Sequence, residues 1–91
     1  MLERILTYTD ESSSSEVLVR ISYPEKQTGD YACAVEVKGG PFDVTTKIFG
    51  LDSMQAIVLA ISFARRILTE SEAHQRSQLY WIAPDRDLGL L

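Results

Sequence analysis

The sequence predicts an α+β fold: a four-stranded antiparallel meander packed on one long amphipathic helix, with a short C-terminal helix or strand. Two observations lead to this prediction. Between residues 2 and 49, four segments alternate apolar with polar residues, which is the period of strands with one buried face. Residues 53–69 instead repeat their apolar residues every three or four positions, as an amphipathic helix does. Because 91 residues suffice for one core, we expect residues 1–91 to form a single domain.

The four predicted strands alternate cleanly enough to assign a buried face to each. They are Leu2–Thr9, Val17–Tyr23, Tyr31–Lys38 and Phe42–Phe49. The residues assigned to the buried faces are Leu2, Leu6 and Tyr8, then Val17, Val19, Ile21 and Tyr23, then Tyr31, Cys33, Val35 and Val37, and last Phe42, Val44, Thr46 and Ile48. Arg4 falls on the same side as the apolar residues of the first strand. Turns at residues 12–15, 28–30 and 39–41 join consecutive strands, and the glycines of the last two permit tight hairpins.

The helix has a recognisable beginning. Asp52 and Gln55 have the spacing of a capping box, and Leu51 with Ala56 has the spacing of a hydrophobic staple. At 100° per residue the predicted core face is Ile57, Ala60, Ile61, Ala64, Ile67 and Leu68. Alanines four residues apart should let the helix axis approach the sheet closely.

After the helix the sequence leaves alternatives open. Thr69 and Glu72 have capping-box spacing, so residues 70–77 form either a second short helix or a continuation of the first. Residues 79–82 read as an added edge strand, and an irregular tail begins at Pro84.

Two apolar helix residues, Leu59 and Phe63, lie beside the polar stripe and need a cover. Tyr80 and Trp81 could supply it from the same chain, and a second copy or another protein could do so from outside. Leu59, Phe63, Tyr80 and Trp81 are therefore the candidate interface residues, since large apolar and aromatic side chains dominate interface energetics.

The sequence contains no grouping of residues that indicates catalysis. His74 lies in a polar run and is predicted to be a solvated surface residue. Cys33 lies on a buried strand face, where burial would raise the pKa of its thiol rather than activate it. One histidine and one cysteine do not make an ordinary zinc site, and the acidic residues lack calcium-loop spacing. We expect no catalytic residue, no cofactor and no metal, and hence not an enzyme.

Charge and hydropathy narrow the range of partners. The formal net charge is −4 and the nine basic residues are scattered, which argues against nucleic acid. The longest apolar stretch, within residues 56–64, is too short to span a membrane. The beginning of the chain lacks the pattern of a secretory signal, and the single cysteine fits a reducing compartment. We therefore expect a cytoplasmic location.

Three sequence pieces resemble a bacterial family of small proteins classed as a domain of unknown function. They are residues 30–33, the helix-start run 49–56 with its Gly-x-Asp-Ser-x-Gln-Ala motif, and Trp81 together with residues 87–90. The resemblance implies a stand-alone domain and carries over no catalytic or binding residue.

The leading functional hypothesis is a non-enzymatic protein-interaction module, with self-association as a homodimer as one form. An immunity or antitoxin-type inhibitor, which would neutralise a basic toxin with an acidic surface, is the alternative. A small enzyme or ligand carrier using Cys33 or His74 is a third hypothesis, in which one of them would have to line a cleft.

Overall fold

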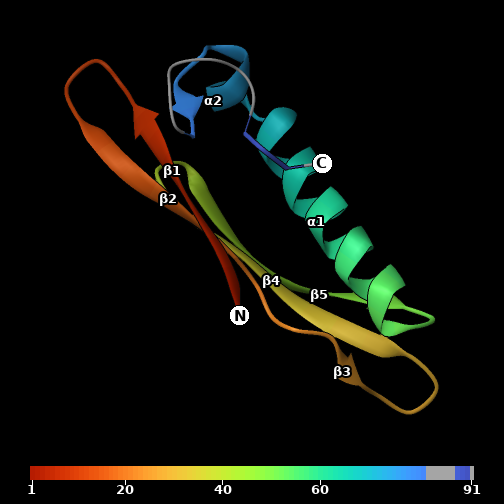
Figure 1. The fold of residues 1–91 in the computed structure, drawn as a ribbon. Helices are drawn as coiled ribbons and strands as arrows, with labels where there is room; N and C mark the ends of the chain where they lie inside the picture. The colour runs from red at the N-terminus through yellow and green to blue at the C-terminus, as the bar shows by residue number, and fades with distance from the viewer. Residues whose placement is uncertain (82–87, 91) are drawn as a thin grey trace.

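The computed structural model describes residues 1–81 and 88–90, and it confirms the α+β class. One antiparallel sheet is covered on one face by a long helix, with the N-terminal strand extending beyond the helix (Figure 1). The strands are β1 (Leu2–Thr9), β2 (Ser14–Ile21), β3 (Glu25–Lys26), β4 (Tyr31–Gly39), β5 (Phe42–Gly50) and β6 (Leu79–Tyr80). The helices are α1 (Ser53–Thr69) and α2 (Glu72–Gln75).

The sheet contains the predicted meander and two further strands. β1, β2, β4 and β5 pair antiparallel in that order. The predicted count of four is wrong because β3 pairs with the beginning of β4 and β6 pairs with the end of β1. Each of these additions is two residues long. A strand that short shows no periodicity in the sequence, so its pairing depends on tertiary contacts.

The first hairpin is tighter than the sequence suggested. Ser14 and Ser15 belong to β2 and pair with Thr9 and Tyr8, so the turn does not extend over residues 12–15. The Asp10 carboxylate caps it by accepting hydrogen bonds from the backbone N–H groups two and three residues later, at 3.0 and 2.9 Å. These two hydrogen bonds hold the pKa of Asp10 below its usual value.

The core lies between the sheet and α1. The inward positions predicted for β2 and β4 are confirmed for six residues that are all buried: Val17, Val19, Ile21, Cys33, Val35 and Val37. The predicted burial of Tyr23 is wrong, because Tyr23 lies beyond the end of β2 and is 61% exposed. Leu2, at the start of β1, is also exposed, and Tyr31 is half-buried. On α1 the buried residues are Ala56, Ala60, Ala64 and Leu68. The predicted face is thus rotated, because the alanine ridge lies at its centre and Ile57 and Ile61 are only half-buried on one flank.

The predicted capping box at the start of α1 is present in part, because the Gln55 side chain bonds to the residue before the cap and not to the cap itself. Asp52 Oδ1 accepts a hydrogen bond from the Gln55 backbone N–H at 2.7 Å. The Gln55 side chain returns to the Leu51 N–H, also at 2.7 Å. The predicted staple is wrong, because Leu51 is 80% exposed while Ala56 is fully buried.

Both alternatives for the C-terminal region are partly realised, as a short helix followed by a short strand. The predicted Thr69 cap is wrong: Thr69 ends α1 and its hydroxyl donates to the Arg65 carbonyl at 2.8 Å. Ser71 caps α2 instead, with its Oγ accepting from the His74 N–H. Residue 82, the end of the predicted edge strand, and Pro84 lie outside the described residues.

The outer face of the sheet carries cross-strand charge pairs. Arg20 on β2 donates to Glu3 on β1 at 2.6 Å, and Lys38 on β4 pairs with Asp43 on β5. Among the described residues, neither helix covers this face. One face of the sheet is therefore core, and the other faces solvent.

Gly50 is essential where β5 turns into α1. A Cβ there would collide with the Ala56 backbone nitrogen and lie 2.7 Å from the Ala56 Cα. We predict that Gly50→Ala lowers the free energy of unfolding by about 3 kcal/mol, at the upper end of typical overpacking costs, because backbone atoms cannot rotate away. Urea denaturation measures this.

The matched control is Gly29→Ala. Gly29 also has no side chain to lose and has open space around it, but its φ is +94°. Its substitution should cost about 1 kcal/mol through backbone strain alone. Equal losses for the two variants would contradict a steric role for Gly50.

Candidate functional site

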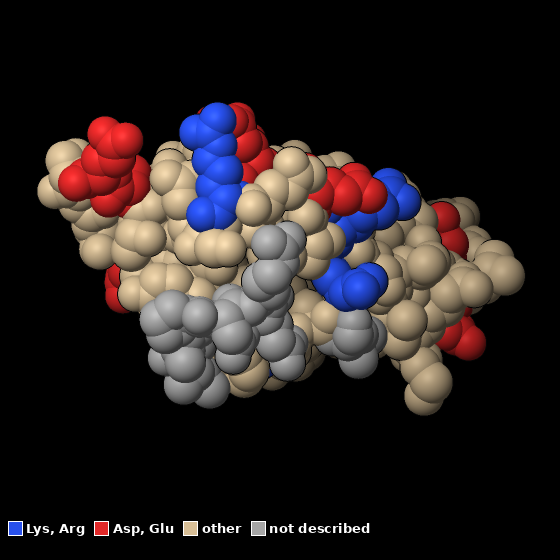
Figure 2. All heavy atoms as spheres, turned by 90° about the horizontal axis from the view of Figure 1, so that it is seen from above, with Lys and Arg blue, Asp and Glu red and all other residues tan. Residues whose placement is uncertain are grey.

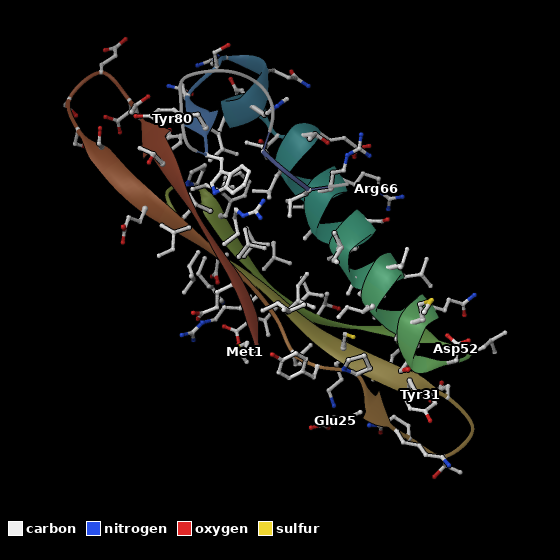
Figure 3. The ribbon with its side chains drawn as sticks, viewed as in Figure 1. Met1, Glu25, Tyr31, Asp52, Arg66 and Tyr80 are labelled. Carbon is white, nitrogen blue, oxygen red and sulfur yellow. The ribbon has the colours of Figure 1, made fainter. Side chains whose placement is uncertain are left out.

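The structure separates the four candidate interface residues into two pairs at opposite edges of the sheet. Leu59 and Phe63 lie against Ile48 of β5. Tyr80 belongs to β6 and pairs with Thr7 of β1. Figure 3 shows Tyr80 and Arg66 on opposite sides of α1. The aromatic residues near the C-terminus therefore do not cover Leu59 and Phe63.

Trp81 has a structural contact on β1. Its ring lies under the Arg4 guanidinium, 3.6 Å from the guanidinium carbon to the ring centroid. Arg4 also donates a hydrogen bond to the Leu88 carbonyl at 2.9 Å. Leu88 is buried and Trp81 is half-buried against the core. Trp81 and Leu88 thus cover the β1 side of the inner face.

On the other side, α1 and β5 form an open groove of about 360 Å³. Its lining is Ile48, Leu59, Ser62, Phe63, Arg65 and Arg66. Leu59 is 42% exposed, whereas Phe63 is half-buried and packs against the core. Neither arginine forms an ion pair with the described part of the chain. The groove is apolar at its base and cationic at one end.

β5 is an edge strand next to this groove. All nine of its residues pair with β4 on one side. Within residues 1–81 and 88–90, no strand pairs with its other side. Because backbone groups of alternate residues point to opposite sides of a strand, about half of the N–H and C=O groups of β5 point to this free edge. Such an edge is a template for pairing with another chain.

Exposed apolar side chains are concentrated in the part of the sequence that forms the end of β5 and the beginning of α1. Nine large hydrophobic residues are exposed in the described chain, and five of them lie between residues 49 and 59. We call these five the β5–α1 surface: Phe49, Leu51, Met54, Val58 and Leu59, with exposed fractions of 53, 80, 74, 45 and 42%. Figure 3 places Asp52 at this end of the molecule.

Sequence reasoning identified only Leu59 within this surface. Two signals could have revealed more of it. Met54 and Val58 are four residues apart, outside the buried alanine ridge, so they form an apolar pair on the solvent side of α1. Phe49 occupies the outward position of an alternating strand, where a polar residue is usual.

Cys33 and His74, the two residues considered for chemistry, lie apart. Cys33 is fully buried on β4, two residues from Tyr31, which pairs with Gly50 near the start of α1. His74 lies in α2, beyond the end of the 17-residue α1, which spans about 25 Å. The prediction that His74 is solvated is wrong, since it is only 7% exposed. The polar run around it misled the prediction because α2 turns His74 inward beside Ala73.

A second hollow of about 260 Å³ lies between α1 and β1. It is lined by Leu2, Glu3, Arg4, Val19, Ile21, Ile61, Gly89 and Leu90. Its two charged residues are already engaged, Glu3 with Arg20 and Arg4 with Trp81 and Leu88. Neither Cys33 nor His74 lines it. It therefore offers no pair of uncommitted polar groups for chemistry.

Groups of three or more histidine, cysteine, aspartate or glutamate side chains with metal-binding proximity do not occur in residues 1–81 and 88–90. Of the helices described, none is both long and apolar enough to cross a membrane.

Burial of Cys33 gives a prediction about its thiol. Desolvation raises the pKa of this thiol, so the folded state holds the proton more tightly than the unfolded state. Its contribution to stability is full below the ordinary thiol pKa of about 8.5 and is lost as pH rises above it. As the pH rises above about 8.5, wild type should lose stability relative to Cys33→Ala, measured by urea denaturation at each pH.

Alkylation provides an independent check of Cys33. Iodoacetamide should label the native protein at least about 100-fold more slowly than the urea-unfolded protein, because reaction requires the core to open. Comparable labelling rates would contradict the burial of Cys33.

Comparison with known proteins places the chain at the level of a family. No curated protein and no solved structure matches the chain. The model of one family, described as a domain of unknown function (DUF6968), matches residues 2–91. Because this match covers the sheet, both helices and the C-terminal segment, the chain belongs to the DUF6968 family.

Proposed function

We propose that this chain is a non-enzymatic protein-interaction module that binds its partner at the free edge of β5 and the adjoining β5–α1 surface. The observation that carries the proposal is that five of the nine exposed large hydrophobic residues of the described chain lie between residues 49 and 59, in the segment that joins the free-edged strand β5 to α1. Single exposed apolar residues are ordinary on protein surfaces, whereas a concentration of them marks an interaction site.

The geometry favours a protein over a small ligand. The groove of Leu59 and Phe63 is open and runs beside a nine-residue strand with an unpaired edge. A partner strand added to β5 would gain main-chain hydrogen bonds, and its inward side chains would lie over the groove. Strand addition therefore uses both features, while a small molecule would use only the groove.

The electrostatics favour this function over neutralisation of a basic toxin. Three of the acidic side chains, those of Glu3, Asp43 and Glu72, already pair with basic residues of the same chain. In Figure 2 the acidic and basic side chains are intermixed over the face shown and do not form a field of one sign. An inhibitor of a basic protein would depend on a continuous acidic surface.

The separation of Cys33 from His74 supports the non-enzymatic part of the proposal, because catalytic groups act in a shared concave site. A buried free thiol is compatible with action in the cytoplasm. The proposal also includes a bacterial origin for the family and the Gly-x-Asp-Ser-x-Gln-Ala helix-start motif as one of its features.

We predict that Leu59→Asp weakens association with the protein partner at least tenfold, because it places a charge in the apolar groove. The affinity-tagged chain, purified gently from the cells that make it, identifies the bound protein by native mass spectrometry. Titration of that purified protein against wild type and variant then gives the two dissociation constants. Hydrogen exchange of the β5 amides should slow in the complex.

Tyr23→Asp is the matched control. Tyr23 is 61% exposed, follows β2 and lies outside the groove, so the same change of an exposed apolar residue to aspartate should leave affinity unchanged. A partner whose binding is insensitive to Leu59→Asp, with no slowing at β5, would refute the proposed surface.

A further inference from the structure

We propose that the partner at the β5 edge is a second copy of this chain, paired antiparallel through β5 about a two-fold axis at Thr45, so that Asp43 of each copy faces Lys47 of the other. This inference rests on the proposed function and specifies its partner. The resulting dimer would have one continuous sheet, with both α1 helices on the same face.

Two outward residues of β5, Asp43 and Lys47, carry opposite charges and lie at equal distances on either side of Thr45. Asp43, Thr45 and Lys47 are exposed and lie on the same outer face, at successive outward positions. In an antiparallel pair centred on Thr45, a residue that precedes Thr45 in one copy lies opposite the residue that follows Thr45 by the same number of positions in the other copy. Asp43 then lies opposite Lys47 twice, once on each side of the axis, and Thr45 lies opposite Thr45. Opposite charges and paired threonines are both favourable cross-strand neighbours.

The inward residues fit the same register. Val44 would lie opposite Thr46, which makes a pair of two β-branched residues. Phe42 would lie opposite Ile48, which makes an aromatic and β-branched pair of the kind that stabilises neighbouring strands. Within the single chain these four residues are only half-buried, although they point toward the core side. They are half-exposed because α1 leaves the outer flank of β5 open, and the second copy would cover this flank.

Other registers do not satisfy the charges. Centring the pair on Val44 or Thr46 separates Asp43 from Lys47. Centring it on Asp43 or on Lys47 places two like charges opposite each other, which is destabilising. Asp43 also stays ionised in the single chain, because the hydrogen bond from Lys38 beside it holds the pKa of its carboxyl below the usual value. The row across the outer face would therefore alternate in sign, from Lys38 through Asp43 to Lys47 of the second copy.

The position of the groove agrees with the same axis. Gly50 adjoins Ala56 at the start of α1, and Ile48 adjoins Leu59 and Phe63 farther along it. α1 therefore runs antiparallel to β5, along the edge where the second copy would pair. Leu59 and Phe63 project beside this edge, and the second copy paired at β5 would cover them.

The first experiment is sedimentation equilibrium of the full chain between about 1 µM and 1 mM, which covers the affinities of weak to moderate homodimers. A dimer of two 10.2 kDa chains is expected. Lys47→Glu and Asp43→Lys, each alone, place like charges opposite each other twice and should raise the dimer dissociation constant at least tenfold. The double variant Asp43→Lys with Lys47→Glu restores both opposite pairs and should return the dissociation constant to near the wild-type value.

A mixture of the two single variants tests the register directly. In a mixed dimer the Asp43→Lys chain has a lysine at both charged positions and the Lys47→Glu chain has a carboxylate at both. Every charge pair across the seam is then of opposite sign, so the two variants should form a mixed dimer although neither forms its own.

Glu36→Lys is the control for these charge reversals. Glu36 lies on the outer face of β4 away from the free edge, and its substitution changes the charge as Asp43→Lys does. It should leave the dimer dissociation constant near the wild-type value. Circular dichroism of each variant separates loss of pairing from loss of fold.

The outcomes separate this inference from the proposed function. A monomer throughout the concentration range, or a dimer unaffected by the charge reversals, would overturn the β5–β5 pairing. If another protein then binds with sensitivity to Leu59→Asp, the proposed function stands without the homodimer. If no protein binds and the chain remains a monomer, both proposals fail.

Discussion

The rest of this structure depends on one constraint: the sheet is wider than the single helix that covers it. Five strands side by side, spaced about 4.8 Å apart, make a sheet about 19 Å wide, whereas a helix with its side chains is about 10–12 Å across. α1 lies mainly over β4 and β5, and the alanine ridge of Ala56, Ala60 and Ala64 holds it close to them. One helix in this position leaves inner-face surface uncovered on both flanks.

On the β1 flank, the chain solves this problem with its own C-terminal segment. Arg4 is the unusual member of an otherwise apolar strand face, and burying a guanidinium there without partners would be costly. Trp81 stacks on it and the Leu88 carbonyl accepts its hydrogen bond. Gly89 allows the segment to lie this close, because its φ is +69° and a Cβ would lie 2.6 Å from an Arg4 nitrogen. The charged residue thus fixes the segment that buries the adjacent apolar surface.

Sequence reasoning succeeded where one strong local signal decided the structure. Alternation fixed the inward residues of β2 and β4, and the spacing of Asp52 and Gln55 fixed the helix start, because neither depends on distant parts of the chain. It failed for His74, whose burial follows from how α2 packs. The candidate site was partly predictable for the same reason. The sequence placed Leu59 and Phe63 on a flank of the helix, but the free edge of β5 could not be read from periodicity, because central and edge strands can share the same alternation. A contact between residues more than 70 positions apart, such as that between Arg4 and Leu88, produces no pattern within a short stretch of sequence.

The charged residues of β5 connect this constraint to function. A long unpaired edge strand promotes unspecific aggregation, and proteins commonly protect such edges with charged side chains. On β5, however, the charges have opposite signs and lie symmetrically about Thr45, so they favour the pairing centred on Thr45 and oppose the pairings centred on Asp43 or Lys47. The same residues that protect the edge would therefore also select its partner. In this view the flank that α1 leaves open at β5 is where the chain would associate, whereas on the β1 flank Trp81 and Leu88 already pack against part of the inner face.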